Sequence, residues 1–155
     1  MNPDKQLRFF DEHRAAGRSL VLAVVFETRG STYSKAGAHM LINEDGVFRG
    51  MLSGGCLEGD LAIRAQLVLE SGKAQVVSYD LANDDELWGL GVGCDGLMRI
   101  VLQPLSAADA YEPFARIATL LRGEVAGEVS IEVPGEDCQV ISLPVVPPPQ
   151  VLILG

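Results

Sequence analysis

The strongest hydrophobic feature near the start of the chain is the continuous apolar run 20–26. Its length and its valines are typical of a strand that is buried on both faces. Apolar runs at 38–42 and 47–52 flank Asn43–Gly46, and the Asp-Gly pair in that link predicts a hairpin. Further strands are expected at 75–79, 97–102, 129–133 and 138–143.

The hydrophobic pattern becomes helical after the tetrapeptide Ser53–Cys56. Apolar residues recur at spacings of 4, 4 and 3, at Leu57, Leu61, Ala65 and Val68. Gly72 is expected to end this helix. Two more helices are expected at 3–14 and 107–121, where Pro113 either kinks the second or marks its true start. Together these elements predict an α+β fold with a mixed or antiparallel sheet and flanking helices.

The end of the sequence predicts a domain boundary. Residues 1–146 are expected to form one domain, and Pro147–Pro149 a stiff linker. Residues 150–155 are expected to form a buried-type strand that ends in glycine, and a strand of this kind after a proline linker is how a nucleotide-binding βα unit begins. We therefore expect 147–155 to be a linker and the first strand of a Rossmann-like domain, with truncation inside a single domain as the alternative.

Composition narrows the class of protein. The 155 residues are 48% hydrophobic and 21% charged, which indicates a folded globular chain. Twelve Lys and Arg against 21 Asp and Glu give a net charge of −9, which disfavours binding to nucleic acid or anionic lipid. The sequence has no apolar run of about 18 residues and no secretory-signal pattern, so no membrane span is expected. Three cysteines are too few for a disulfide scaffold and favour a cytoplasmic protein with reduced thiols.

The first candidate site is the segment Ser53–Asp60. Gly54 and Gly55 allow a sharp turn and a close approach of the backbone to a ligand. Cys56 would lie at a helix N-terminus, where backbone donors stabilise a thiolate, although Glu58 nearby opposes that charge. The alternative is a tight strand-to-helix turn with a structural cysteine.

The second candidate site is the glycine-rich segment Trp88–Gly96. Gly91, Gly93 and Gly96 match the G-x-G-x-x-G pattern of dinucleotide binding, but the motif opens a strand instead of a helix. We therefore reject a dinucleotide site and expect a glycine-rich loop that brings Cys94 to a cleft. A surface turn is the alternative.

The third candidate site is the loop Thr28–Gly37, where Arg29, Ser31 and Lys35 could bind phosphate. Solvated surface charge is the alternative. A metal site of the usual ligand spacing is not expected, since there is no Cys-x-x-Cys motif. Cys138 falls in a late strand and is expected to be buried.

These segments together resemble a known family. The matching stretches, in order, are Glu27–Thr32, Ala36–Ala38, Leu52–Glu58 and Trp88–Cys94. Over about residues 15–105 the chain resembles the xanthine dehydrogenase accessory proteins of the XdhC/CoxI type. Many members have Pro-Arg where this chain has Tyr33-Ser34, so Lys35 would supply the positive charge, and Asp95 replaces a frequent glycine.

The resemblance implies that the protein is a chaperone for the molybdenum cofactor and not an enzyme. Such a protein carries the molybdopterin-type cofactor without using it, while a cysteine desulfurase helps to install the terminal sulfur. It then delivers the cofactor to apo xanthine dehydrogenase or a related molybdenum hydroxylase. A homodimer is an open alternative. The cofactor-binding residues implied are Gly54, Gly55, Cys56, Glu58, Gly91, Gly93, Cys94, Arg29, Ser31 and Lys35, with Cys56 as a molybdenum contact.

Two other classes of protein remain open from the sequence. A thiol oxidoreductase would use Cys56 and Cys94 as a redox pair. A nucleotide-binding or regulatory module would use the glycines only as turns, and replacing both cysteines would then leave binding intact.

Overall fold

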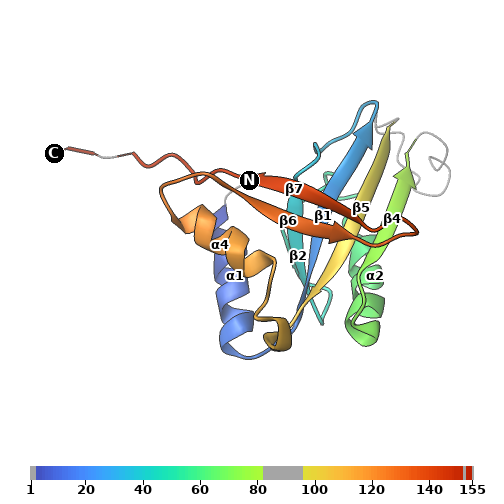
Figure 1. The fold of residues 1–155 in the computed structure, drawn as a ribbon, viewed down its shortest axis with the longest axis horizontal. Coiled ribbons are helices and arrows are strands. Elements are labelled where there is room, and N and C mark those ends of the chain that lie inside the picture. Colours follow the sequence, from blue (N-terminus) through green and yellow to red (C-terminus); the bar gives the residue numbers. More distant parts are fainter. Residues whose placement is uncertain (1–2, 82–95, 152, 155) are drawn as a thin grey trace.

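An antiparallel five-stranded sheet forms the centre of the protein, as the computed structural model shows for residues 3–81, 96–151, 153 and 154 (Figure 1). The strand order is β3-β2-β1-β5-β4, and β6 and β7 form a separate two-stranded sheet. The strands are β1 (Leu20–Arg29), β2 (His39–Asn43), β3 (Phe48–Arg49), β4 (Gln75–Asp80), β5 (Leu97–Leu105), β6 (Gly127–Val133) and β7 (Gln139–Val145). The helices are α1 (Pro3–Ala15), α2 (Glu58–Ser71), the 3-10 turn η1 (Ala107–Asp109) and α4 (Phe114–Arg122). The predicted α+β class with flanking helices is confirmed, and every strand pair formed by described residues is antiparallel.

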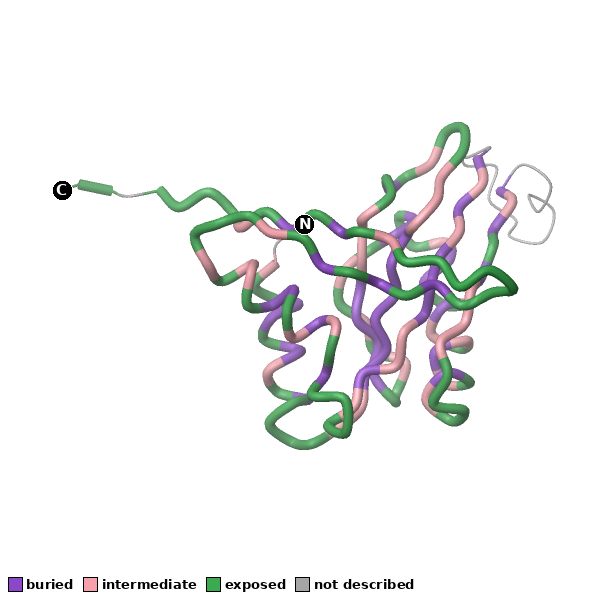
Figure 2. Tube along the Cα trace, in the orientation of Figure 1, coloured by how far each residue is buried: buried purple, intermediate pink, exposed green. Residues whose placement is uncertain are grey.

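Strand β1 is buried on both faces, as its continuous apolar run predicts (Figure 2). Leu20, Leu22 and Val24 belong to the core that α1, α4 and the β6–β7 hairpin cover. The alternate residues of β1 belong to a second core beneath α2. Successive side chains of a strand point to opposite faces of the sheet. A strand that is covered on both faces therefore has apolar residues at consecutive positions.

Local signals placed most element ends correctly. Asn43 fixes the predicted hairpin, since its Oδ1 accepts hydrogen bonds from the backbone N–H groups of Asp45 and Val47 at 3.0 and 2.9 Å. Gly72 ends α2 in the left-handed conformation, with φ at 69°. Pro113 marks the true start of a helix, because α4 begins at Phe114.

The prediction that Cys138 is buried was wrong. Cys138 is exposed, and it lies in the exposed link between β6 and β7, directly before β7 begins at Gln139. A two-stranded sheet that covers a core with one face buries only alternate residues, and in β7 these are Leu143 and Val145.

The C-terminal segment leads away from the rest of the chain (Figure 1). Val151, Ile153 and Leu154 lie in neither a helix nor a strand, and their exposed fractions are 83%, 88% and 87%. The assignment of 147–155 to a linker and a further domain stays a prediction. Among the helices of the described residues, none is long and apolar enough to cross a membrane.

Candidate functional site

Glu58, the first residue of α2, fixes the conformation of the preceding loop Leu52–Leu57, which contains Gly54 and Gly55 and is called the glycine loop. Its side chain is 1% exposed, and Oε1 accepts hydrogen bonds from the backbone N–H groups of Leu52 and Ser53 at 2.7 and 2.8 Å. Its other oxygen, Oε2, accepts the Ser53 hydroxyl at 2.5 Å and the Gly55 N–H at 3.0 Å. The Ser53 Oγ in turn accepts the N–H of Leu57 at 2.8 Å. The carboxylate of Glu58 therefore serves to position the loop.

This hydrogen-bond network lowers the pKa of Glu58 and occupies backbone N–H donors of the loop. Burial raises the pKa of Glu58, but the hydrogen bonds from Ser53 and Leu52 outweigh it and lower the pKa below 4.5. Four backbone N–H groups, those of Leu52, Ser53, Gly55 and Leu57, are satisfied within the loop. These four are thereby withdrawn from the phosphate-binding role that glycine loops often take.

Cys56 lies in this loop and packs in part against the core beneath α2. It is half-buried, and its Sγ donates a hydrogen bond to the carbonyl oxygen of Ser53 at 3.2 Å. α2 begins at Glu58, within two residues of Cys56 as predicted. Gly55 has φ at 115°, and a Cβ added there would meet nothing within 4 Å. The backbone beside the thiol is therefore open to a ligand.

The loop Thr28–Gly37 lies against Gly54 of the first candidate segment and against Gly96, the last residue of the second. A Cβ on Gly54 would come within 3.3 Å of the Tyr33 ring, whose side chain is 61% exposed. A Cβ on Gly96 would come within 2.5 Å of the carbonyl oxygen of Arg29 and 2.6 Å of that of Ser31. Only glycine fits at Gly96. The loop Thr28–Gly37 therefore meets both Gly54 of the first segment and Gly96, the one described residue of the second segment.

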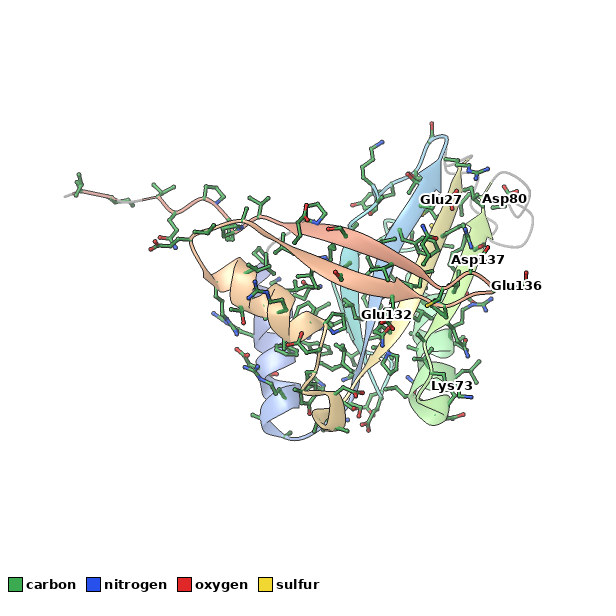
Figure 3. The ribbon with its side chains drawn as sticks, in the orientation of Figure 1. Glu27, Lys73, Asp80, Glu132, Glu136 and Asp137 are labelled. Atoms are coloured by element: carbon green, nitrogen blue, oxygen red, sulfur yellow. The ribbon has the colours of Figure 1, made fainter. Side chains whose placement is uncertain are left out.

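Strand β5 pairs with β1 on one side and with β4 on the other, and this explains why the loop after β1 lies against Gly96. Arg29 is opposite Leu97 in the register, and Leu97 is opposite Asp80. Figure 3 shows Glu27 and Asp80 at this same end of the sheet. The end of β1 and the start of β5 therefore bring the loop Thr28–Gly37 beside Gly96.

The cations of the site differ in their partners. Glu27 pairs with Arg29 at 2.8 Å and with Arg99 at 3.0 Å. The hydrogen bonds from Arg99 and then Arg29 lower the pKa of Glu27. Lys35 forms no ion pair with any described residue and is exposed, as is Ser31. Lys35 is thus the cation most available to an anionic ligand.

Sequence reasoning missed two contributors to this end of the sheet. The sequence marks Tyr33 only as a departure from the family pattern, although an exposed aromatic residue in a hydroxyl-rich loop is itself a signal for ligand stacking. Tyr79 donates a hydrogen bond to Asp60 Oδ2 at 2.5 Å, and Arg64 Nε donates to the same oxygen at 2.7 Å. Burial first, and then the bond to Asp60, raise the pKa of Tyr79, so its hydroxyl stays protonated. This contact ties the first turn of α2 to the end of β4.

Part of the predicted site falls on residues that the structure does not describe. Gly91, Gly93 and Cys94 lie outside the described residues. Within the described residues, no group of three His, Cys, Asp or Glu side chains is arranged to hold a metal ion.

The comparison with protein families decides the relationship. The model of the XdhC and CoxI family matches residues 13–80, which include the loop Thr28–Gly37 and the Ser53–Glu58 loop. Over this segment the chain is similar to the XdhC and CoxI family. The family resemblance drawn from the sequence motifs is thus confirmed.

Two curated relatives agree with this similarity. The chain is 40% identical over 81 residues to a protein of Bacillus subtilis that is named as a probable xanthine dehydrogenase subunit, and the match covers 52% of this chain and 24% of that protein. It is 31% identical over 102 residues to "Molybdenum cofactor insertion chaperone PaoD" of Escherichia coli, covering 66% of this chain and 31% of that one. The chain therefore spans about a quarter to a third of the length of these relatives.

The fold of one solved protein matches as well. A crystal structure from Bacillus halodurans, which is described as a xanthine dehydrogenase, has 32% sequence identity and a TM-score of 0.70. The match covers 88% of this chain and 40% of that chain.

Proposed function

We propose that this chain binds the molybdenum cofactor and carries it, without turnover, to a molybdenum hydroxylase. The observation that carries the proposal is the meeting of the Cys56 loop, the loop Thr28–Gly37 and Gly96 at one end of the sheet. The name of the Escherichia coli relative, a molybdenum cofactor insertion chaperone, supports it.

The described residues suit the parts of that cofactor. The Cys56 sulfur is a soft donor and suits a molybdenum–sulfur centre. Lys35 and Arg29, with the exposed hydroxyl of Ser31, suit the phosphate. The exposed Tyr33 ring suits stacking on the pterin. When bound, the cofactor would supply the metal centre that the receiving hydroxylase needs.

Loop rigidity is the contribution that Glu58 makes to binding in this proposal. Its four hydrogen bonds hold the backbone on either side of Gly54 in place before a ligand arrives. A preformed loop loses less conformational entropy on binding, which increases affinity. Glu58, Gly54 and Gly55 therefore act as positioning residues, while Cys56 touches the cofactor.

The similarity to the family and the names of the relatives support the proposed partners. We propose that the receiving protein is apo xanthine dehydrogenase or a related hydroxylase, since one curated relative is named for xanthine dehydrogenase and the other for cofactor insertion. A cysteine desulfurase would deliver the terminal sulfur while the cofactor is held, in the cytoplasm. Gly91, Gly93 and Cys94 would complete the site, and 147–155 would lead into a Rossmann-like domain.

Cofactor retention in a host that makes the cofactor tests this proposal. Molybdenum and the oxidised, fluorescent pterin are measured per chain after purification. Lys35→Gln is expected to lower retention about tenfold, because one charge-assisted contact to phosphate is lost.

Lys73→Gln is the matched control, since it removes the same charge. Lys73 is exposed and lies just before β4, whereas the site lies where β4 ends (Figure 3). Absence of molybdenum and pterin from the unmodified chain would overturn the proposal. Equal loss in both variants would show that Lys35 makes no contact with the cofactor.

A further inference from the structure

A cavity of about 460 Å³ lies between helix α1 and the edge strand β3. One face of α1 lines it with Lys5, Arg8, Phe9 and Glu12, which follow the helical spacing of three and four residues. Arg49 of β3 lines the other side. None of these residues belongs to the loops around Cys56, so the cavity is a separate feature of the molecule.

Three cations of this cavity have no carboxylate partner among the described residues. Among the described residues, the basic side chains that form ion pairs are those of Arg14, Arg18, Arg29, Arg64, Arg99 and Arg122. Lys5, Arg8 and Arg49 are absent from that set, and Glu12 is the one carboxylate that lines the cavity. In a chain of net charge −9, three such cations around one cavity mark a local positive potential.

Arg49 is held in position by neighbouring groups of the protein itself. Its guanidinium carbon lies 5.1 Å from the centroid of the Phe9 ring, and its Nη1 donates to the carbonyl oxygen of Phe48 at 2.9 Å. Phe9 is only 5% exposed, so the ring that supports Arg49 is itself fixed by the core. A guanidinium fixed in this way loses little entropy when it binds an anion.

We propose that this cavity binds a small phosphate monoester that also carries an amino or hydroxyl group. A phosphate monoester has a charge of about −1.5 to −2 at neutral pH and three acceptor oxygens, which match two guanidinium groups and an ammonium group. Glu12 would accept a hydrogen bond from the amino or hydroxyl group. The cavity volume lies within the range of roughly 300–1,000 Å³ that is usual for small-molecule sites.

Titration by NMR tests the proposal with two probes, inorganic phosphate and O-phosphoethanolamine, at constant ionic strength. We expect saturable shifts of the backbone amides of α1 with both probes. Arg8→Gln should weaken both affinities about tenfold, because it removes one charge-assisted contact. Arg116→Gln is the matched control, since Arg116 lies on α4, away from the cavity, and forms no ion pair with a described residue.

A second variant separates specific recognition from general charge attraction. Glu12→Gln should weaken binding of O-phosphoethanolamine, which loses its ammonium partner, and strengthen binding of inorganic phosphate, which loses a repulsion. Absence of shifts in α1, or equal weakening by Arg8→Gln and Arg116→Gln, overturns the proposed site. Strengthened binding of both probes by Glu12→Gln overturns the role given to the amino group.

A phosphate group can also be presented by a lipid, and a sedimentation experiment distinguishes that source. Vesicles of phosphatidylethanolamine and phosphatidic acid are mixed with the chain and centrifuged. We expect the chain to stay in the supernatant, since its net charge of −9 opposes an anionic surface. If the unmodified chain sediments with the vesicles and Arg8→Gln abolishes this, the cavity binds a lipid headgroup, and the proposal of a soluble ligand is overturned.

Discussion

The carboxylate of Glu58 accepts hydrogen bonds from both the backbone N–H and the hydroxyl of Ser53, at 2.8 and 2.5 Å. This pair makes the conformation of the glycine loop depend on one side chain in the first turn of α2. Replacing that side chain should therefore loosen the loop on which Cys56 lies.

Glu58→Gln is expected to lower the free energy of unfolding by about 2 kcal/mol, since the amide group leaves buried donors poorly paired. Urea unfolding measures the change. Glu70→Gln is the matched control, because Glu70 is exposed near the end of the same helix and should cost less than about 0.5 kcal/mol. Equal effects of the two substitutions would contradict the role assigned to Glu58.

The same carboxylate predicts a pH dependence of stability. The pKa of Glu58 in the folded protein lies below 4.5, so its contribution is fully present above that pH. The contribution is lost as the pH falls from 4.5 through the lowered folded pKa. The difference in unfolding free energy between the unmodified chain and Glu58→Gln should therefore shrink as the pH falls below 4.5. A difference that stays constant down to acid unfolding would rule out the charged network.

Gly55 and Gly59 provide a contrast within a few residues of each other. Gly55 has φ at 115°, so Gly55→Ala should destabilise the fold by about 1–3 kcal/mol through backbone strain. Gly59 lies in α2 with open space at its Cβ position, so Gly59→Ala should stabilise by about 0.5–1 kcal/mol. Thermal or urea unfolding measures both. If both substitutions change the free energy of unfolding in the same direction, the turn at Gly55 does not have the backbone conformation described.

Local sequence signals predicted the elements but not the contacts between them. The apolar run of β1, the spacing of Leu57 to Val68 and the glycine at 72 each act over a few residues, so the chain alone reveals them. The register of Arg29 with Leu97 depends on pairing across about seventy residues. The approach of the loop Thr28–Gly37 to Gly96 follows from that register, and no local sequence pattern reveals it.

Glu58 and Cys138 show the same limit for single side chains. A carboxylate in the first turn of a helix is favourable for electrostatic reasons alone, so nothing local revealed that Glu58 folds back onto Ser53. Cys138 stands next to an apolar strand, and only the position of β6 and β7 over the core shows that it is exposed.

The exposure of Cys138 gives a direct test of this correction. Cys138→Ala should change the free energy of unfolding by less than about 0.5 kcal/mol, as is usual for exposed positions. In the native chain its thiol should react with iodoacetamide without unfolding. A loss of more than about 1 kcal/mol, or protection of the thiol until unfolding, would place Cys138 in the core after all.

The proposed function depends on contact between the Cys56 thiol and the molybdenum cofactor, and the amount of cofactor retained by cysteine variants measures that contact. Molybdenum and pterin per chain are measured for the unmodified protein, Cys56→Ala and the matched control Cys138→Ala, all produced in one cofactor-making host. Loss of a soft ligand should reduce affinity by about ten- to a hundredfold in Cys56→Ala, corresponding to about 1–3 kcal/mol, and leave Cys138→Ala unchanged. Retention of as much cofactor by Cys56→Ala as by the unmodified protein would make the thiol structural and contradict the claim.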